Sequence, residues 1–203
     1  MEDKEMQEYM EDKNLPDPIM RRFYKDFARR VLWLDTEVTD GFLEFGKFIL
    51  QWNAEDADKP VEERVPIKLM FFSPGGSLYV NNAMVDIISM SKTPVYGYNM
   101  GMAFSAACFM FLACHKRFAL PSSSFMLHKG NAAMEGDTIN IENTAADYKR
   151  SIARLVDLVV TRTTIPKNVA NKKMNSDWFI TAQDAHEKYG FVDEILTDME
   201  QVV

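Results

Sequence analysis

The sequence places a serine where a strand signal gives way to a helix signal, a position from which a hydroxyl can attack a carbonyl group. Residues 101–107 read GMAFSAA, with Ser105 at or near the first turn of the predicted helix. Free N–H groups and the positive end of the helix dipole at such a turn would stabilise an oxyanion. A serine there is also commonly a helix N-cap, so the local sequence leaves both roles open.

A serine hydroxyl becomes nucleophilic only beside a base, and the chain has three histidines. His186 lies in a polar helix signal and is expected to be solvated, while His115 lies in a charged turn. His128 follows a short apolar run, at the carboxyl end of a predicted strand, where α/β folds place their chemistry. His128 is the best candidate base, although a structural histidine fits the same position. No H-x-x-x-H or C-x-x-C spacing is present, so no metal site is predicted.

Two other segments carry groups that could complete such a site. Asp177 stands directly before Trp178 and Phe179, which are expected to anchor the segment and fix the carboxylate. A carboxylate would orient the imidazole, but the residues alone do not distinguish Asp177 from an ordinary loop aspartate. The segment SPGG (73–76) follows a strand signal, and its glycines either leave backbone N–H groups open to a ligand or simply make a tight turn.

The elements that must position these residues alternate between strand and helix signals. Helical apolar spacing separates short β-rich runs, which is typical of an α/β domain with a largely parallel sheet. The expected strands are 29–34, 66–73, 93–100, 117–120, 123–128 and 191–196, and the expected helices are 42–52, 78–90, 103–114, 141–160 and 181–189.

Length and composition limit the classes of protein to which the chain can belong. Its 203 residues suffice for one domain, expected over 23–203, preceded by an acidic, Met-rich N-terminal arm over 1–22. A net charge of −7 argues against nucleic acid and anionic membranes as partners. The chain has two cysteines, no leader-like segment and an apolar run limited to 103–114, shorter than the roughly 20 residues of a membrane helix. These features predict a cytoplasmic protein.

Four segments taken together resemble the ClpP serine peptidases, the proteolytic subunits of Clp protease. That family carries SPGG, then G-x-A-x-S, then K-R-x-x-L-P with a following M-I-H, and finally R-D-x-F with a downstream Y-G-L-(I/V)-D. The same order recurs here, within roughly 23–196, in SPGG (73–76), GMAFSAACF (101–109), RFALPSSSFMLH (117–128) and DWFITAQDAHEKYGFVDEIL (177–196).

The resemblance implies the ClpP/crotonase-like α/β fold, made of repeated β-α units with a protruding handle helix at 142–164. By position, Ser105 matches the family nucleophile, His128 the general base and Asp177 the acid that orients it. Gly76 and Ala106 match the residues whose backbone N–H groups form the oxyanion hole. The residues alone reach Ser105 and His128 as candidates, whereas Asp177 is selected only through the resemblance.

The resemblance also implies a substrate and an assembly. The substrate is a peptide or an unfolded protein, bound as an added strand beside residues 129–141, and no cofactor takes part. The family forms homo-oligomeric heptameric rings, stacked in pairs around an inner chamber that an AAA+ unfoldase feeds.

Several positions depart from the family pattern. Lys129-Gly130 stand where the family has Gln-Pro, Ser176 where it has arginine, and Phe104 where it has a small residue, so that Phe104 is expected to narrow the pocket or change its specificity. Residues 1–22 do not resemble the family's axial-pore segment. A divergent member, such as a phage-encoded one acting in capsid maturation, would fit. Two alternatives are a non-catalytic ring component and a crotonase-type acyl-CoA enzyme; the complete Ser/His/Asp set argues against both.

Overall fold

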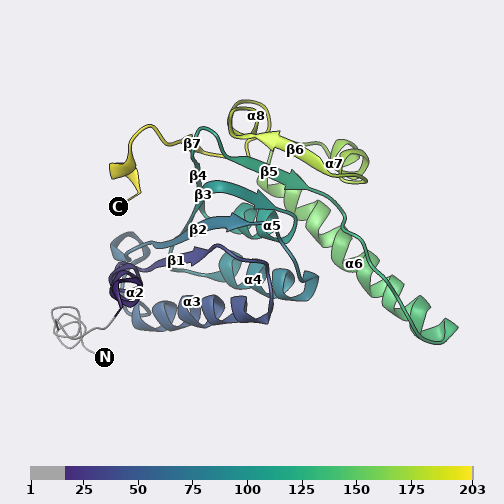
Figure 1. The fold of residues 1–203 in the computed structure, drawn as a ribbon, viewed down its shortest axis with the longest axis horizontal. Coiled ribbons are helices and arrows are strands. Elements are labelled where there is room, and N and C mark those ends of the chain that lie inside the picture. Colours follow the sequence, from purple (N-terminus) through teal and green to yellow (C-terminus); the bar gives the residue numbers. More distant parts are fainter. Residues whose placement is uncertain (1–16, 203) are drawn as a thin grey trace.

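The sheet of this protein is mostly parallel, as the alternating sequence pattern predicted. The computed structural model describes residues 17–202, and seven strands of this part form one sheet (Figure 1). Five strands follow the order β1-β2-β3-β4-β7 and all pair in parallel. The strands are β1 (Val31–Leu34), β2 (Ile67–Ser73), β3 (Val95–Phe104), β4 (Lys116–Ala119), β5 (Ser124–Leu127), β6 (Trp178–Thr181) and β7 (Glu194–Ile195).

Strand β3 divides its pairing between two neighbours. Its first half pairs with β4, whereas Met102–Phe104 pair in parallel with β5. Buried Asn99 lies at the branch, where its side chain donates to the Ser124 carbonyl at 2.9 Å and accepts from the Gly101 N–H at 3.0 Å. Gly101 has a φ of +152°, and a Cβ there would lie 2.8 Å from the Phe72 ring. The branch therefore directs the end of β3 toward β5 and away from β4.

The helices cover the sheet and build the core around one apolar helix. Figure 1 shows α3 and α4 together below β1 and β2, and α5 contacts the sheet, α4 and α6. The α-helices are α2 (Pro18–Ala28), α3 (Leu43–Glu55), α4 (Leu78–Met90), α5 (Ala106–Ala113), α6 (Thr138–Arg162), α7 (Lys167–Lys173) and α8 (Ala182–Glu187), and the 3-10 turns are η1 (Asp40–Phe42), η2 (Val61–Glu63) and η3 (Met199–Gln201).

The sequence predicted a buried helix over 103–114, and α5 confirms its burial but begins later. All eight residues of α5 are buried, because none of them carries a charge and elements on several sides cover the helix. The first predicted residues of the helix belong to β3 instead, since Met102–Phe104 are held by pairing with β5. This shift leaves Ser105 alone between a strand and a helix.

Helix α6 forms the protruding handle that the resemblance implied. Figure 1 shows it running out from the body of the domain, with its first turns farthest away. Asp137 caps its start by accepting from the Asn140 N–H at 2.9 Å. Its buried residues all lie in its second half, which packs on α5: Ser151, Leu155, Val156 and Val159. The predicted fold class, with its handle, is confirmed.

At the N-terminal end, α2 begins at Pro18 and continues past position 22, where the arm was predicted to end. Proline is tolerated in a first helical turn, where its missing N–H has no intrahelical role. Asp17 caps the helix by accepting from the Ile19 N–H at 2.9 Å. The rest of the predicted arm, residues 1–16, lies outside the described residues, so the division of the chain at 22 stays a prediction.

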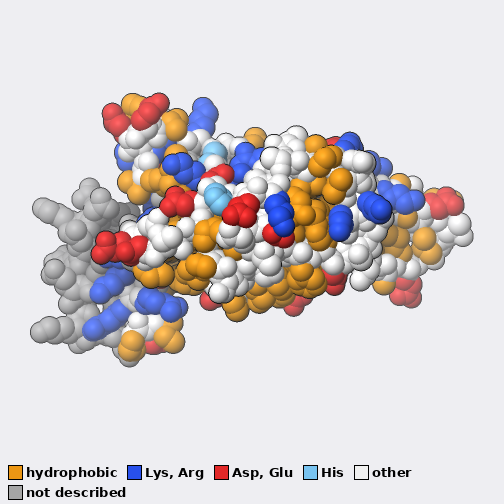
Figure 2. All heavy atoms as spheres, turned by 90° about the horizontal axis from the view of Figure 1, so that it is seen from above, with side chains coloured by type: hydrophobic (Ala, Val, Ile, Leu, Met, Phe, Trp, Pro, Cys, Tyr) orange, Lys and Arg blue, Asp and Glu red, His pale blue; other side chains and the backbone are white. Residues whose placement is uncertain are grey.

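The surface seen in Figure 2 mixes charges with hydrophobic side chains. Lysine and arginine side chains gather near the left end of this face and stand in a loose row toward its right end, with hydrophobic and acidic side chains around them (Figure 2). Among the described residues, no helix combines the length and the apolar character needed to cross a bilayer.

A buried carboxylate joins the end of α3 to the strands. Asp56 is fully buried and accepts hydrogen bonds from both terminal nitrogens of Arg30, from Lys59 Nζ at 2.9 Å and from Thr93 Oγ1 at 3.1 Å. The Arg30 hydrogen bonds, with those of Lys59 and Thr93, outweigh desolvation and hold the pKa of Asp56 well below its usual range. Its charged form is thus the one that the fold stabilises.

Replacing Asp56 with asparagine is expected to destabilise the protein by about 3 kcal/mol at neutral pH, because Arg30 is left without its buried counter-charge. A lowered folded pKa gives stability that is complete above the unfolded pKa, near 3.9, and that is lost as the pH falls toward the folded value. Urea unfolding at pH 7 and pH 3 should show a smaller acid-induced loss in Asp56→Asn than in the wild type. Asp58→Asn, at an exposed carboxylate nearby, is the control; an equal acid-induced loss in Asp56→Asn and the wild type would contradict the assignment.

Candidate active site

Ser105 occupies a strained turn between β3 and α5. Its φ of 52° and ψ of −121° lie outside the favoured regions for a residue with a side chain, at a cost of about 1–3 kcal/mol. The Ser105 N–H donates to the Met126 carbonyl at 2.8 Å, which ties this turn to β5. Its hydroxyl makes no N-cap hydrogen bond. A sharp strand-to-helix turn of this kind holds a serine hydroxyl clear of the backbone, as in a nucleophile elbow.

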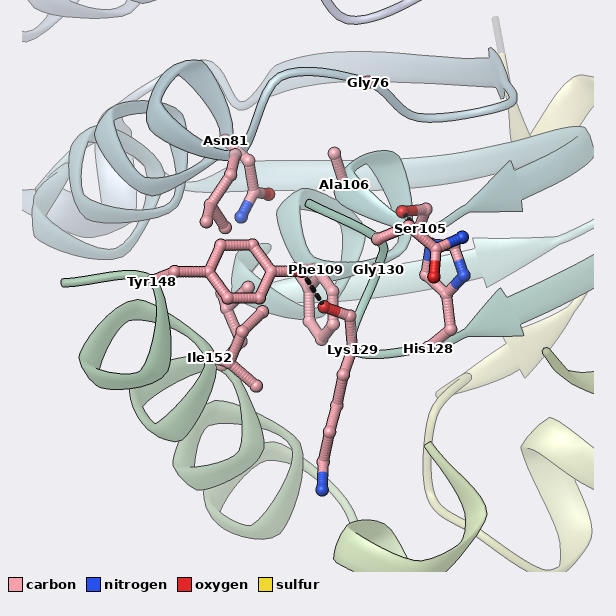
Figure 3. A pocket seen from close by; sticks show the side chains of 13 residues that line it. Gly76, Asn81, Ser105, Ala106, Phe109, His128, Lys129, Gly130, Tyr148 and Ile152 are labelled. Carbon is pink, nitrogen blue, oxygen red and sulfur yellow. Dashed lines mark hydrogen bonds between the residues drawn. The ribbon is translucent and has the colours of Figure 1, made fainter. Parts of the chain in front are cut away.

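His128 reaches Ser105 because β5 runs parallel to the end of β3. Phe104 pairs with Met126, so both strands end at the same edge of the sheet. His128 Nε2 lies 2.6 Å from Ser105 Oγ, and the two side chains face each other in Figure 3. The strand end that the sequence singled out for a base therefore meets the predicted nucleophile directly.

Asp177 is brought to His128 by an antiparallel pairing that the sequence analysis did not foresee. In the β5–β6 register, Leu127 lies opposite Trp178, so His128 and Asp177 are the next facing pair. His128 Nδ1 lies 2.8 Å from Asp177 Oδ1. Since a carboxylate only accepts, the proton of the neutral imidazole lies on Nδ1, and Nε2 is free to accept from the serine hydroxyl. The Asp177 side chain remains 60% exposed.

The SPGG loop lies directly against this turn because two of its residues lack a side chain. A Cβ on Gly75 would lie 2.6 Å from the Phe104 carbonyl oxygen and 2.7 Å from Ser105 Cβ, and Gly75 also has a φ of +95°. A Cβ on Gly76 would collide with the Val38 carbonyl oxygen. The loop is fixed from its other side, because the Val38 N–H donates to Gly75 and the Ser77 N–H donates to Val38, both at 2.8 Å.

The backbone N–H groups of Gly76 and Ala106 are available to a ligand in this arrangement. Neither donates in any hydrogen bond found among residues 17–202. Both residues line a cavity of about 140 Å³ that Ser105 and His128 also line (Figure 3). Two free donors beside a hydroxyl–imidazole pair are the arrangement that tetrahedral oxyanions require.

The segment after His128 is held in place from two sides. The Lys129 N–H donates to the Met174 carbonyl at 2.8 Å, and the Lys129 carbonyl accepts from the Tyr148 hydroxyl at 2.5 Å. Lys129 Nζ donates to the Asn171 carbonyl and the Asn175 side chain. Within 129–141, the stretch expected to lie beside a bound peptide, the last four residues belong to α6, which begins at Thr138. Burial raises the pKa of Tyr148, so its hydroxyl stays protonated as the donor.

Other predicted residues lie elsewhere or behave differently. His115 Nδ1 accepts from the Val95 N–H at the start of β3, the opposite end of that strand from Ser105, and His186 is exposed on α8. Phe104 does not line the cavity; it packs edge-on against Phe179 at 5.6 Å, so the expected narrowing by Phe104 is not found there. Trp178 anchors its segment as predicted, by packing on Tyr189.

Sequence reasoning did not single out the polar residues that the helices bring to the cavity, Asn81 on α4 and Tyr148 on α6. Tyr148 carried a signal, since its spacing from Ile152 and Leu155 put all three on one helix face, but that signal indicated packing only. Asn81 carried none, because a single asparagine in a helix is usually solvated.

Comparison with known proteins identifies the family. The sequence model described as Clp protease matches residues 19–199. The ATP-dependent Clp protease proteolytic subunit of Deinococcus radiodurans is 29% identical over 180 residues, covering 88% of this chain and 84% of the relative. Proteolytic subunit 2 of Corynebacterium diphtheriae is 29% identical over 185 residues, covering 90% and 88%. A solved structure of a ClpP1 mutant from Listeria monocytogenes has a TM-score of 0.74 at 23% identity and covers 88% of this chain and 98% of that one. This chain belongs to the Clp protease family of peptidases.

Proposed function

We propose that this chain is a serine endopeptidase that cleaves peptides or unfolded proteins through Ser105, His128 and Asp177. The observation that carries the proposal is the continuous contact from Ser105 Oγ to His128 Nε2 at 2.6 Å and from His128 Nδ1 to Asp177 Oδ1 at 2.8 Å. These are the distances at which a base removes a hydroxyl proton and a carboxylate orients the base.

The reaction follows from where the atoms lie. Ser105 Oγ attacks the peptide carbonyl carbon while His128 Nε2 takes the hydroxyl proton, and the carbonyl oxygen becomes an oxyanion facing the Gly76 and Ala106 N–H groups. The C–N bond then breaks as His128 returns the proton to the leaving amine. Water attacks the resulting ester, with His128 again as the base, and releases the acid and Ser105.

Asp177 and the oxyanion donors have distinct tasks in this scheme. Asp177 stabilises the imidazolium that forms when His128 accepts the proton. Each donor of an oxyanion hole contributes about 3 kcal/mol to the transition state, because it is already oriented when the charge develops. Tight contact between Gly75 and Ser105 keeps the Gly76 donor next to the nucleophile.

The proposal extends to the assembly that the family resemblance implies. The exposed first half of α6 offers an extended surface for contact with another ring of the same chain. We infer homo-oligomeric heptameric rings, stacked in pairs around the active sites, with an AAA+ unfoldase as the feeding partner in the cytoplasm. The relatives' names, which call the protease ATP-dependent, support such a partner.

Native mass spectrometry after treatment with a fluorophosphonate tests activity and assembly together. We expect the mass of one heptamer or of two stacked heptamers, with one probe per chain, and peptide mapping should place the probe on Ser105. A ring without any probe would favour the alternative of a non-catalytic ring component. A labelled monomer would leave the chemistry standing and contradict the assembly.

A further inference from the structure

One polar side chain in the candidate site is buried without a full set of partners. Asn81, on α4, is fully buried, and its Oδ1 has no hydrogen-bond partner. Its Nδ2 makes a single contact with another side chain, at 3.4 Å to Asn82 Oδ1. A buried acceptor left unpaired costs about 1–3 kcal/mol, so a fold that keeps one requires an explanation.

Asn81 lies where a bound ligand could supply the missing hydrogen-bond partner. Asn81 lines the same cavity as Ser105 and Ala106, and Figure 3 shows its amide directed into the space in front of Phe109 and Tyr148. The apolar side chains of Leu78, Ile152 and Leu155 line the same cavity. A buried amide without a partner, in a cavity that also has apolar side chains, is the usual arrangement of a pocket that recognises one polar group of a ligand.

We propose that this cavity receives the substrate side chain that precedes the cut bond, and that Asn81 makes it select a side chain ending in a primary amide, above all glutamine. The inference rests on the proposed function. With the carbonyl oxygen at the Gly76 and Ala106 N–H groups and its carbon at Ser105, the adjoining side chain lies beside Ala106, where the cavity begins.

A primary amide is the group that matches Asn81 on both sides. Its N–H₂ donates to Asn81 Oδ1 and its carbonyl accepts from Asn81 Nδ2, and the pairing holds for either orientation of the Asn81 amide. An apolar side chain leaves Oδ1 unpaired. A lysine side chain would bury an ammonium with no carboxylate among the lining residues, since Asp and Glu are absent from them.

The test compares two peptides that are identical except for glutamine or methionine before the cut bond, two unbranched side chains of similar length. The wild type is expected to prefer the glutamine peptide by about tenfold or more in kcat/KM, because only that peptide satisfies the buried amide. Asn81→Leu, which keeps the size of the side chain, should reverse the preference.

A second variant keeps the test decisive if leucine disturbs folding. Asn81→Asp retains the shape and, when ionised, offers only acceptors, so the glutamine carbonyl loses its donor and cleavage after lysine should rise relative to cleavage after glutamine. If Ser105 is labelled and peptides are cleaved, but all three proteins show the same preference, the selectivity proposal is overturned and the proposed function stands. If Ser105 of the wild type is not labelled, the proposed function fails and the selectivity proposal fails with it.

Discussion

Ser105→Ala is expected to lower peptide cleavage roughly a millionfold, to the background rate, because the variant has no group that can form the acyl-enzyme. The folded state should change little. The hydroxyl makes one side-chain contact, with His128, and no cap bond, and alanine keeps the same backbone requirement at a φ of 52°. Turnover of a fluorogenic peptide and the thermal midpoint, measured on the same preparation, check both statements.

A matched variant tests whether the loss of cleavage is specific to Ser105 or follows the loss of another serine hydroxyl. Ser122 lies exposed in the turn before β5, and Ser122→Ala should retain wild-type turnover. Fluorophosphonate should label Ser122→Ala and leave Ser105→Ala unlabelled. Cleavage at the wild-type rate by Ser105→Ala, free of contaminating peptidase, would remove Ser105 from the chemistry and favour another nucleophile.

Local signals were sufficient to place Ser105 and His128. Each follows a strand, and parallel strands end at one edge of a sheet, so the topology alone brings the two residues near each other. The sequence could not show that β3 divides its pairing at Asn99. That branch turns Met102–Phe104 toward β5 and so brings the end of β3 beside the strand that precedes His128.

Asp177 could not be assigned to the site from the residues alone. Its contact with His128 depends on the register between β5 and β6, which are separated by the whole handle and α7. Strand β6 has four residues, WFIT, of which the first three are all apolar, so its sequence shows no alternation of apolar and polar residues that would indicate a half-buried strand. The family motif supplied Asp177 instead, because a motif records a long-range contact that local patterns do not contain.

Two departures from the family pattern have a physical account in the structure. Phe104, in place of a small residue, packs on Phe179 of β6 and so strengthens the strand contact that carries Asp177. Lys129, in place of glutamine, bonds to Asn171 and Asn175 and ties the segment after His128 to the loop before Asp177. Both side chains, Phe104 from the end of β3 and Lys129 from the segment after β5, therefore contact the part of the chain that carries Asp177.

Asp177→Asn is expected to lower kcat by between about 10²-fold and 10⁴-fold while leaving the fold intact. An asparagine can donate to His128 Nδ1, which stabilises the tautomer whose Nε2 carries the proton and can no longer accept from Ser105. The upper figure is typical of a buried acid. Asp177 is 60% exposed, so water replaces part of its stabilisation of the imidazolium, and the loss should fall below that limit.

The control for this variant removes an equal charge from the same region. Asp184→Asn loses a surface ion pair with Lys188 at the end of α8, which water and salt screen, and should keep wild-type kcat. The rate of fluorophosphonate labelling should fall in Asp177→Asn together with kcat, because both reactions need His128 as a base. A kcat that is unchanged in Asp177→Asn would mean that His128 is oriented by the pairing of β5 with β6 alone, and Asp177 would then have no catalytic part.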